Sequence, residues 1–289
     1  MNTKQDYEGQ NFSNFILSNT EVRTLFSPNV GQEFLIFVSL PRNYSNSTKT
    51  YPVLYVLDAN GYFAMVTQIV RQLELDLNFP ELIVVGIGYP VKYFIESFGY
   101  RGREVTPTKD DETYSEFLEG FSEARGLTIR FEGTGGAENF HEFICETLIP
   151  FTNKNYRADN NENTLVGYSA SGLFATYSLL HPMRTFNRFL ICSPSLWWND
   201  KVIFRYEAEF AAKHQVLESN VFFSAGSLEE LIDDPDPFNM ISNLQQLVDI
   251  LRGRKYEGLN INSYIFDDET HLSVVPAAIS RGLRTIFEQ

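Results

Sequence analysis

Residues 164–180 read TLVGYSASGLFATYSLL, and this stretch is the most informative one in the chain. The apolar residues 164–166 lead into a Gly-x-Ser-x-small turn, and a mostly apolar segment of helical length follows the turn. The pattern predicts a nucleophile elbow, in which a strand turns sharply into a helix and exposes a serine hydroxyl above the sheet. Ser169 is the predicted nucleophile, and Gly167 is the small neighbour that such a strained turn requires. The stretch therefore indicates a serine hydrolase.

One position departs from the common Gly-x-Ser-x-Gly pattern. Ser171 stands where that pattern has its second glycine, although Gly172 follows it directly. A short motif of this kind also occurs by chance at buried strand–turn–helix junctions. Because α/β-hydrolases carry the acid and then the histidine after the serine, a catalytic triad requires both partners downstream of Ser169.

A candidate acid follows the strand-like run NVFFSA at residues 220–225. Glu229 comes just after the carboxyl end of this run, where open α/β sheets build their sites. We predict Glu229 as the triad acid, with the adjacent Glu230 as the alternative. The same acidic loop also contains Asp233, Asp234 and Asp236. The loop lacks the alternating ligands and the glycine of an EF-hand, so a solvated loop is a better interpretation than a calcium site.

The chain has four histidines, and one of them follows the last predicted strand. His271 comes after the run 261–266 and precedes a helix that we expect to begin around residue 274. A loop histidine at this place is the expected general base of a triad. The other histidines have structural explanations, on or beside predicted helices: His141, His181 and His214.

Apolar runs elsewhere predict a mostly parallel sheet. Residues 53–57 and 82–87 are nearly continuous apolar runs, which is typical of strands buried on both faces. Helical spacing over residues 62–75 separates them, so strand, helix and strand alternate as in a doubly wound sheet with helices on both faces. The fold class predicted is therefore α/β, with the α/β-hydrolase fold. Further strands are predicted at 164–166, 188–192, 221–225 and 262–266, with an antiparallel N-terminal edge within 22–40.

The chain length predicts a single domain over residues 1–289, since 289 residues that are 43% hydrophobic can bury one sizeable core. Segment 91–134 breaks the strand–helix alternation with little periodicity and many acidic and aromatic residues. The segment is much longer than a usual connection, and its aromatic side chains need burial, which disfavours a disordered insertion. We predict a loop-rich lid or wall over the site.

The net charge and the cysteine content limit the classes of partner and the cellular compartment that we expect. A net charge of −14 with a pI near 4.8 disfavours nucleic acid and anionic membrane surfaces. No apolar run of about 20 residues exists to span a bilayer. Cys145 and Cys192 lack metal or redox spacing and indicate buried thiols in a reducing compartment. With Met1 as the native start the chain lacks a signal pattern, so we expect a cytoplasmic location. The predicted chemistry needs no metal and no organic cofactor, and the sequence indicates no oligomeric state.

Further motifs occur in order from about Phe34 to the C-terminus: YPVLYVLDANG at 51–61, RGREVTPT at 101–108, GGAENF at 135–140, SPSLWW at 193–198 and ETHLSVVP at 269–276. Together with the elbow they resemble the Putative esterase family of α/β-hydrolases. That family contains esterase D (S-formylglutathione hydrolase), the mycolyltransferases, and the enterochelin or ferri-siderophore esterases, and the likeness is greatest to the last group. The resemblance implies a serine esterase with a small-molecule ester substrate. Its spacing of glycine and carboxylate points to Glu229 through Gly226.

Ester hydrolysis through an acyl-enzyme also requires hydrogen-bond donors for the oxyanion. The backbone N–H of Ala170, directly after the nucleophile, is the first predicted donor. The second is predicted in the turn after the third strand, where we favour the N–H of Ala59 over that of Asn60.

The resemblance also implies substrate contacts. Arg101 or Arg103 is expected to contact an anionic or catechol-bearing substrate, with a surface salt bridge as the alternative. Glu104 departs from the family pattern, in which aspartate is common at this place. Trp198, with Trp197, is expected to form an aromatic wall, and one of the two to belong to the core.

Several functions fit these residues. An esterase for ferri-siderophores of the enterobactin type is the leading hypothesis, although the net charge of −14 would slow a polyanionic substrate unless nearby arginines reverse the local potential. The alternatives are a general carboxylesterase, a thioesterase like S-formylglutathione hydrolase, an acyltransferase, and an inactive binding protein of the same fold. The presence of nucleophile, acid and base in the required order argues against the last.

Overall fold

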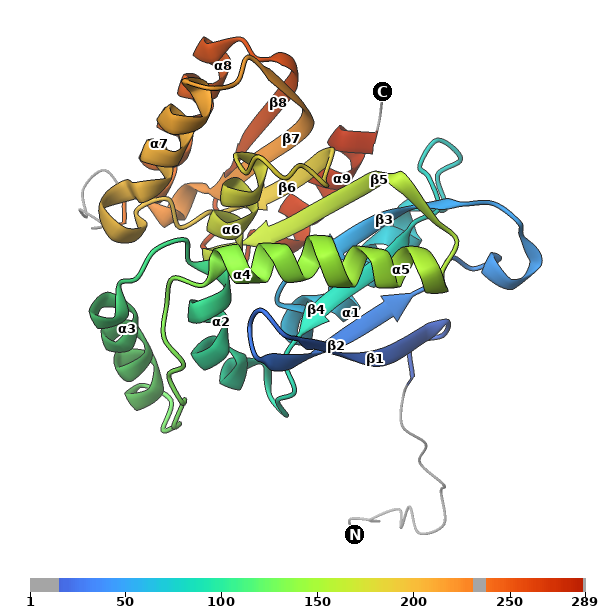
Figure 1. The fold of residues 1–289 in the computed structure, drawn as a ribbon, viewed down its shortest axis with the longest axis horizontal. Helices are drawn as coiled ribbons and strands as arrows, with labels where there is room; N and C mark the ends of the chain where they lie inside the picture. Colours follow the sequence, from blue (N-terminus) through green and yellow to red (C-terminus); the bar gives the residue numbers. More distant parts are fainter. Residues whose placement is uncertain (1–15, 231–237, 288–289) are drawn as a thin grey trace, which may run out of the picture.

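In the computed structural model, which describes residues 16–230 and 238–287, a mostly parallel sheet forms the centre of the molecule (Figure 1). Within these residues its eight strands are ordered β1-β2-β4-β3-β5-β6-β7-β8. β1 pairs antiparallel with β2, and β2 antiparallel with β4, whereas the other neighbouring strands are parallel. The strands are β1 (Thr20–Ser27), β2 (Gln32–Ser39), β3 (Tyr51–Val56), β4 (Ile83–Gly88), β5 (Ala158–Tyr168), β6 (Arg188–Cys192), β7 (Val216–Gly226) and β8 (Glu257–Phe266).

The predicted fold class is confirmed, including the antiparallel N-terminal edge. The apolar runs located the buried part of each strand better than its ends. β5, β7 and β8 begin several residues before the predicted positions, and their first halves are more exposed than their last. Polar residues at the start of a strand carry no apolar pattern, so the sequence marked only the half that enters the core.

Helices cover both faces of the sheet, as Figure 1 shows. Because side chains alternate along a strand, Leu54 and Val56 face one layer while Val53 and Tyr55 face the other. The first layer contains α1 (Ala59–Leu73) and α9 (Val275–Phe287). The second contains α4 (Ala137–Glu142), the π-helical turn η3 (Phe143–Leu148), α5 (Ile149–Asn155), α6 (Ala170–Leu179), α7 (Trp198–Ala211) and α8 (Met240–Arg254).

Segment 91–134 is more helical than predicted. After the short turn η2 (Phe94–Ser97) it forms α2 (Phe98–Val105) and α3 (Asp111–Glu123), and irregular stretches remain before η2, between the two helices and after α3. The pattern for α2 is weak because glycines occupy two of its buried positions. An added Cβ would lie 1.7 Å from the Arg130 carbonyl oxygen at Gly99 and 2.4 Å from the Tyr114 ring at Gly102. At these positions neighbouring groups pack against the helix backbone itself. The buried face of α2 therefore lacks the apolar side chains whose periodicity predicts a helix.

Parallel pairing brings the carboxyl ends of β3, β5, β6, β7 and β8 to one edge of the sheet. Open α/β sheets build their sites at this edge. Across the described ranges, 16–230 and 238–287, no helix is both long enough and apolar enough to cross a membrane.

Candidate active site

Ser169 occupies the predicted sharp turn between β5 and α6. Its backbone is strained, with φ 59° and ψ −123°, and its N–H donates to the Cys192 carbonyl oxygen at 3.0 Å. The turn is tight enough that a Cβ on Gly167 would lie 2.1 Å from the Ser171 carbonyl oxygen. Only glycine fits there, which explains the residue two places before the serine.

His271 connects Ser169 to Glu229. Its Nε2 lies 3.1 Å from the Ser169 hydroxyl oxygen, and its Nδ1 lies 2.6 Å from a carboxylate oxygen of Glu229. The three side chains come from the carboxyl ends of β5, β7 and β8, so the parallel sheet brings together residues that are up to 102 positions apart in the chain. This is the geometry of a nucleophile, a base and an orienting acid.

The Glu229 carboxylate is held by three donors. One oxygen accepts the His271 Nδ1 hydrogen bond, and the other accepts from the Gly226 N–H at 2.6 Å and from the Ser193 hydroxyl at 2.7 Å. Several donors on one buried carboxylate fix its orientation. The alternative, Glu230, instead accepts from the backbone N–H and hydroxyl of Ser242 at the start of α8. Asp233, Asp234 and Asp236 lie outside the described residues.

The loop that carries His271 is fastened to the rest of the site. The Tyr168 hydroxyl donates to the His271 carbonyl oxygen, and the two rings lie 4.9 Å apart between centroids. The Leu228 N–H donates to the Glu269 carbonyl oxygen at 2.9 Å. A Cβ on Gly226 would lie 2.2 Å from that same oxygen, so this glycine allows the acid loop and the histidine loop to touch.

The two predicted oxyanion donors begin two helices that follow paired strands and lie on opposite faces of the sheet. Ala59 is the first residue of α1 and Ala170 the first of α6, and the strands that precede them, β3 and β5, are paired in the sheet. First-turn N–H groups of a helix have no acceptor inside the helix and are free to bind an anion. The Asn60 side chain is tied to Tyr89 by hydrogen bonds of 2.9 and 2.7 Å with its backbone.

The residues predicted to contact substrate are placed differently from one another. Arg101 is buried against Asp58, with Nε 2.8 Å from the carboxylate. Arg103 is partly exposed and donates to the buried Glu104 and to Gln32. Burial raises the pKa of Glu104 to about 7, against the opposing effect of Arg103.

Trp198 belongs to the core. It is 2% exposed, packs edge-on against Tyr114, and donates from its indole to the Thr108 carbonyl oxygen at 3.3 Å. Trp197 is partly exposed and contacts Phe238, with ring centroids 4.5 Å apart. A substrate contact of Arg101, Arg103 or Trp198 stays a prediction.

Sequence reasoning missed four residues that build the site. Asp58 and Ser171 bind each other beneath the elbow, while Ser193 and Tyr168 hold the acid and the histidine loop. The departure of Ser171 from the glycine of the common motif was the one available signal. A serine that replaces glycine at a buried turn brings a hydroxyl that needs a hydrogen-bond partner.

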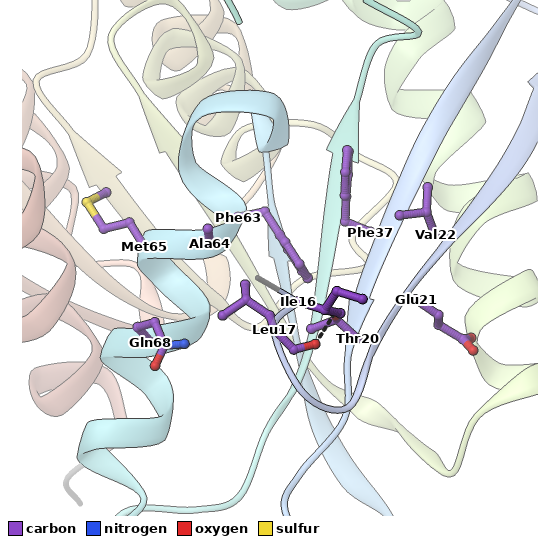
Figure 2. Close-up of a pocket in the computed structure, with 10 residues that line it drawn as sticks. All are labelled: Ile16, Leu17, Thr20, Glu21, Val22, Phe37, Phe63, Ala64, Met65 and Gln68. Atoms are coloured by element: carbon purple, nitrogen blue, oxygen red, sulfur yellow. Dashed lines mark hydrogen bonds between the residues drawn. The ribbon is translucent and has the colours of Figure 1, made fainter. Parts of the chain in front are cut away.

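An open groove lies away from the triad (Figure 2). Its volume is about 890 Å³, and Figure 2 shows it between α1 and strands β1 and β2, lined mainly by apolar side chains such as Phe37, Phe63 and Ile16. None of Ser169, Glu229 and His271 lines it. In the parts of the chain that the structure describes, no group of three or more His, Cys, Asp or Glu side chains is arranged to hold a metal ion.

The sheet order, the elbow and the order of the three side chains define an α/β-hydrolase. The family model described as Putative esterase matches residues 27–259, and the chain belongs to this family of esterases. It is 31% identical over 278 residues to the ferri-bacillibactin esterase BesA of Bacillus subtilis (strain 168), covering 93% of this chain and 90% of that protein.

Two solved structures are similar over nearly their whole length. The BES protein from Bacillus cereus is 30% identical with a TM-score of 0.79, covering 96% of this chain and 98% of that one. The siderophore hydrolase EstB from Aspergillus nidulans is 25% identical with a TM-score of 0.77, covering 95% of this chain and 97% of that one. The predicted family and the esterase class are thereby confirmed.

Proposed function

We propose that Ser169, His271 and Glu229 form the catalytic triad of this esterase. The observation that carries the proposal is the unbroken chain of contacts from the Ser169 hydroxyl through both imidazole nitrogens to the buried Glu229 carboxylate, at 3.1 and 2.6 Å. His271 Nε2 takes the hydroxyl proton as the serine oxygen attacks the ester carbonyl, and it then protonates the departing alcohol. Glu229 holds the Nδ1–H tautomer and stabilises the imidazolium that forms. Water, deprotonated by the same nitrogen, releases the acid.

Two backbone N–H groups stabilise the tetrahedral oxyanion in this proposal, those of Ala170 and Ala59. Support comes from their places at the first residues of helices that follow the paired strands β3 and β5, because both N–H groups lack helical acceptors and both helix dipoles favour negative charge there. Donors fixed before the reaction stabilise developing charge without reorganising during it.

The substrate proposed is a ferri-siderophore ester of the enterobactin type. Support comes from the relatives, since BesA is named for ferri-bacillibactin and EstB for siderophores. A general short-chain carboxylic ester is the second candidate, and the net charge of −14 favours it because a polyanion is repelled at long range. We place the reaction in the cytoplasm, where Cys145 and Cys192 would stay reduced; both are free thiols, and burial raises the pKa of Cys145 to about 11 and that of Cys192 to about 12.

A substrate panel tests both candidates. The purified chain and its Ser169→Ala variant are assayed against p-nitrophenyl butyrate, S-formylglutathione, a feruloyl ester and ferric enterobactin. We expect turnover of the simple ester and faster turnover of the ferric siderophore, both lost in Ser169→Ala. Hydrolysis of p-nitrophenyl butyrate with no turnover of the siderophore lactone would leave the general carboxylesterase.

Arg103→Ala sharpens the substrate assignment. If the partly exposed Arg103 attracts a catecholate, its loss raises KM for ferric enterobactin several-fold more than KM for the neutral p-nitrophenyl ester. Equal changes in the two KM values would argue against charge recognition by this residue.

A further inference from the structure

Three buried polar side chains meet next to the two proposed oxyanion donors: Asp58 precedes Ala59 in the chain, Ser171 follows Ala170, and Arg101 contacts Asp58. Arg101, which is 6% exposed, donates from Nε to one carboxylate oxygen of Asp58 at 2.8 Å, and the Ser171 hydroxyl donates to the other at 2.7 Å. The Arg101 Nη2 also donates to the Tyr168 carbonyl oxygen at 3.0 Å. One guanidinium thus joins the turn after β3 to the turn after β5.

Each contact falls next to a residue of the proposed machinery. Asp58 directly precedes Ala59 and has a left-handed backbone, with φ 53°, that turns the chain into α1. Its carboxylate does not cap α1, because both oxygens are engaged by Arg101 and Ser171. On the other turn, Tyr168 directly precedes Ser169. The network therefore fixes the backbone on both sides of the site.

We propose that Arg101 is a positioning residue that sets the distance between the N–H groups of Ala59 and Ala170, and so shapes the oxyanion hole. The proposal rests on the triad and the oxyanion donors proposed above. It replaces the direct substrate contact predicted for Arg101 with an indirect role.

The guanidinium suits this task because its N–H groups form a rigid planar fork. One edge is fixed on the Asp58 carboxylate and one N–H on the Tyr168 carbonyl, so neither turn can shift alone without breaking a buried charge-assisted hydrogen bond. Burial removes water as a substitute partner. Displacements of about 1 Å in an active site can cost about a hundredfold in rate.

The network also accounts for the departure from the common elbow motif. Glycine at position 171 would leave one Asp58 oxygen without its hydroxyl donor, whereas Ser171 supplies it from the first turn of α6. Arg101 itself belongs to α2 in segment 91–134. The segment that the sequence predicted as a lid therefore contributes a side chain to the base of the site.

The experiment measures turnover per active site in Arg101→Met, Arg101→Lys and Ser171→Ala with p-nitrophenyl butyrate, a neutral ester. Titration with a fluorophosphonate gives the concentration of competent sites, so partial unfolding does not lower the measured kcat. The affinity of a trifluoromethyl ketone, which binds as a tetrahedral oxyanion, is measured alongside KM. Arg254→Met is the matched control, because Arg254 pairs with the buried Glu207 at 2.9 Å where α8 leads into β8, at the opposite edge of the sheet.

We expect kcat to fall about tenfold to a hundredfold in Arg101→Met, within the cost of losing one oxyanion donor. KM should change less than threefold, and trifluoromethyl ketone affinity should fall in parallel with kcat. Arg101→Lys should recover part of the loss, and Ser171→Ala should show a smaller loss of the same kind. Arg254→Met should lower Tm without changing kcat per site. Ser171→Ala removes only one hydroxyl, so it tests the network even where Arg101→Met does not fold.

Two results would overturn the proposal. The first is a kcat per site and a trifluoromethyl ketone affinity within twofold of the unaltered chain in the folded Arg101 and Ser171 variants. The second is a raised KM for ferric enterobactin at unchanged kcat, which would make Arg101 a substrate contact. The Ser169→Ala variant separates this proposal from the proposed function. If Ser169→Ala is active, both the nucleophile and the positioning role are overturned. If Ser169→Ala is inactive and the Arg101 variants have unchanged activity, only the positioning role is overturned.

Discussion

Helix α6 has a serine–histidine contact near each end, and the two contacts have the same length. Before its first turn, the Ser169 hydroxyl lies 3.1 Å from His271 Nε2; near its last turn, the Ser178 hydroxyl lies 3.1 Å from His141 Nε2. A carboxylate accompanies each contact: Glu229 bonds His271 directly, whereas Glu138 bonds His181, which packs against His141. The comparison shows that the residue types of a triad do not by themselves define one.

The two ends differ in what is buried and what is open. At the first end the His271 side chain is 38% exposed and the Glu229 side chain 1% exposed. At the second, His141 is fully buried and its ring is tilted by 41° against that of His181, with centroids 4.1 Å apart. The His181 side chain is 10% exposed, while that of Glu138 is 56% exposed. An accessible imidazole on a buried carboxylate can exchange protons with a substrate in a fixed tautomer. At the second end the arrangement is reversed: the imidazole of His141 is inaccessible to a substrate, and the carboxylate of Glu138 is exposed to water.

Substituting the two serines gives the largest expected contrast. Ser169→Ala should lower kcat by a factor of about a thousand or more and abolish fluorophosphonate labelling, because the attacking oxygen is lost. Ser178→Ala, which removes the equivalent oxygen from the other end, should leave kcat within about twofold. Turnover and mass-spectrometric labelling of both variants decide the matter. Stoichiometric labelling of Ser169→Ala would move the nucleophile to a neighbouring serine such as Ser195.

The carboxylates give the next contrast. Glu229→Gln should lower kcat about a hundredfold or more, because a neutral amide no longer stabilises the imidazolium or selects its tautomer. Orienting acids often cost less than the nucleophile, so the loss should be smaller than in Ser169→Ala. Glu138→Gln should leave kcat unchanged. Glu230→Gln is the control at the neighbouring position in the chain. If Glu230→Gln lost most of its kcat while Glu229→Gln stayed active, the triad acid would be Glu230.

The sequence predicted the first end of α6 and could not predict the second. Gly167 and the apolar run before it located Ser169, and the order of the strands located Glu229 and His271, because parallel strands place their carboxyl ends together. Ser178 and His141 meet only because two helices pack side by side, and no spacing in the sequence encodes that. Asp58 and Ser171 were missed because their contact joins residues 113 positions apart in the chain, and the serine at position 171 was the one sign of it. Arg101 was found through a motif, but its partner lies 43 residues away, and only the packed structure shows that it faces inward.

The smallest expected effect is on the pH dependence of the free energy of unfolding. It arises from His141, at the second end of α6. Burial, and next the neighbouring His181, lower the pKa of His141 to about 4, from an ordinary value of about 6.5. The unfolded chain therefore binds a proton at His141 as the pH falls through 6.5, while the folded chain stays neutral there until about pH 4. Stability contributed by the neutral imidazole is complete above pH 6.5 and is lost between 6.5 and 4. The gap between the two pKa values corresponds to on the order of 3 kcal/mol.

A His141→Gln variant isolates this contribution. Glutamine cannot be protonated in this range, so the variant should lose less stability than the unaltered chain between pH 7 and pH 4, whatever its stability at pH 7. Urea unfolding at several pH values measures both free energies, and the difference between the two chains removes the titration of the carboxylates they share. If the free energy of unfolding changed with pH in parallel for His141→Gln and the unaltered chain, His141 would accept a proton within the folded structure. The two ends of α6 would then differ only in the Ser169 backbone and the Glu229 carboxylate.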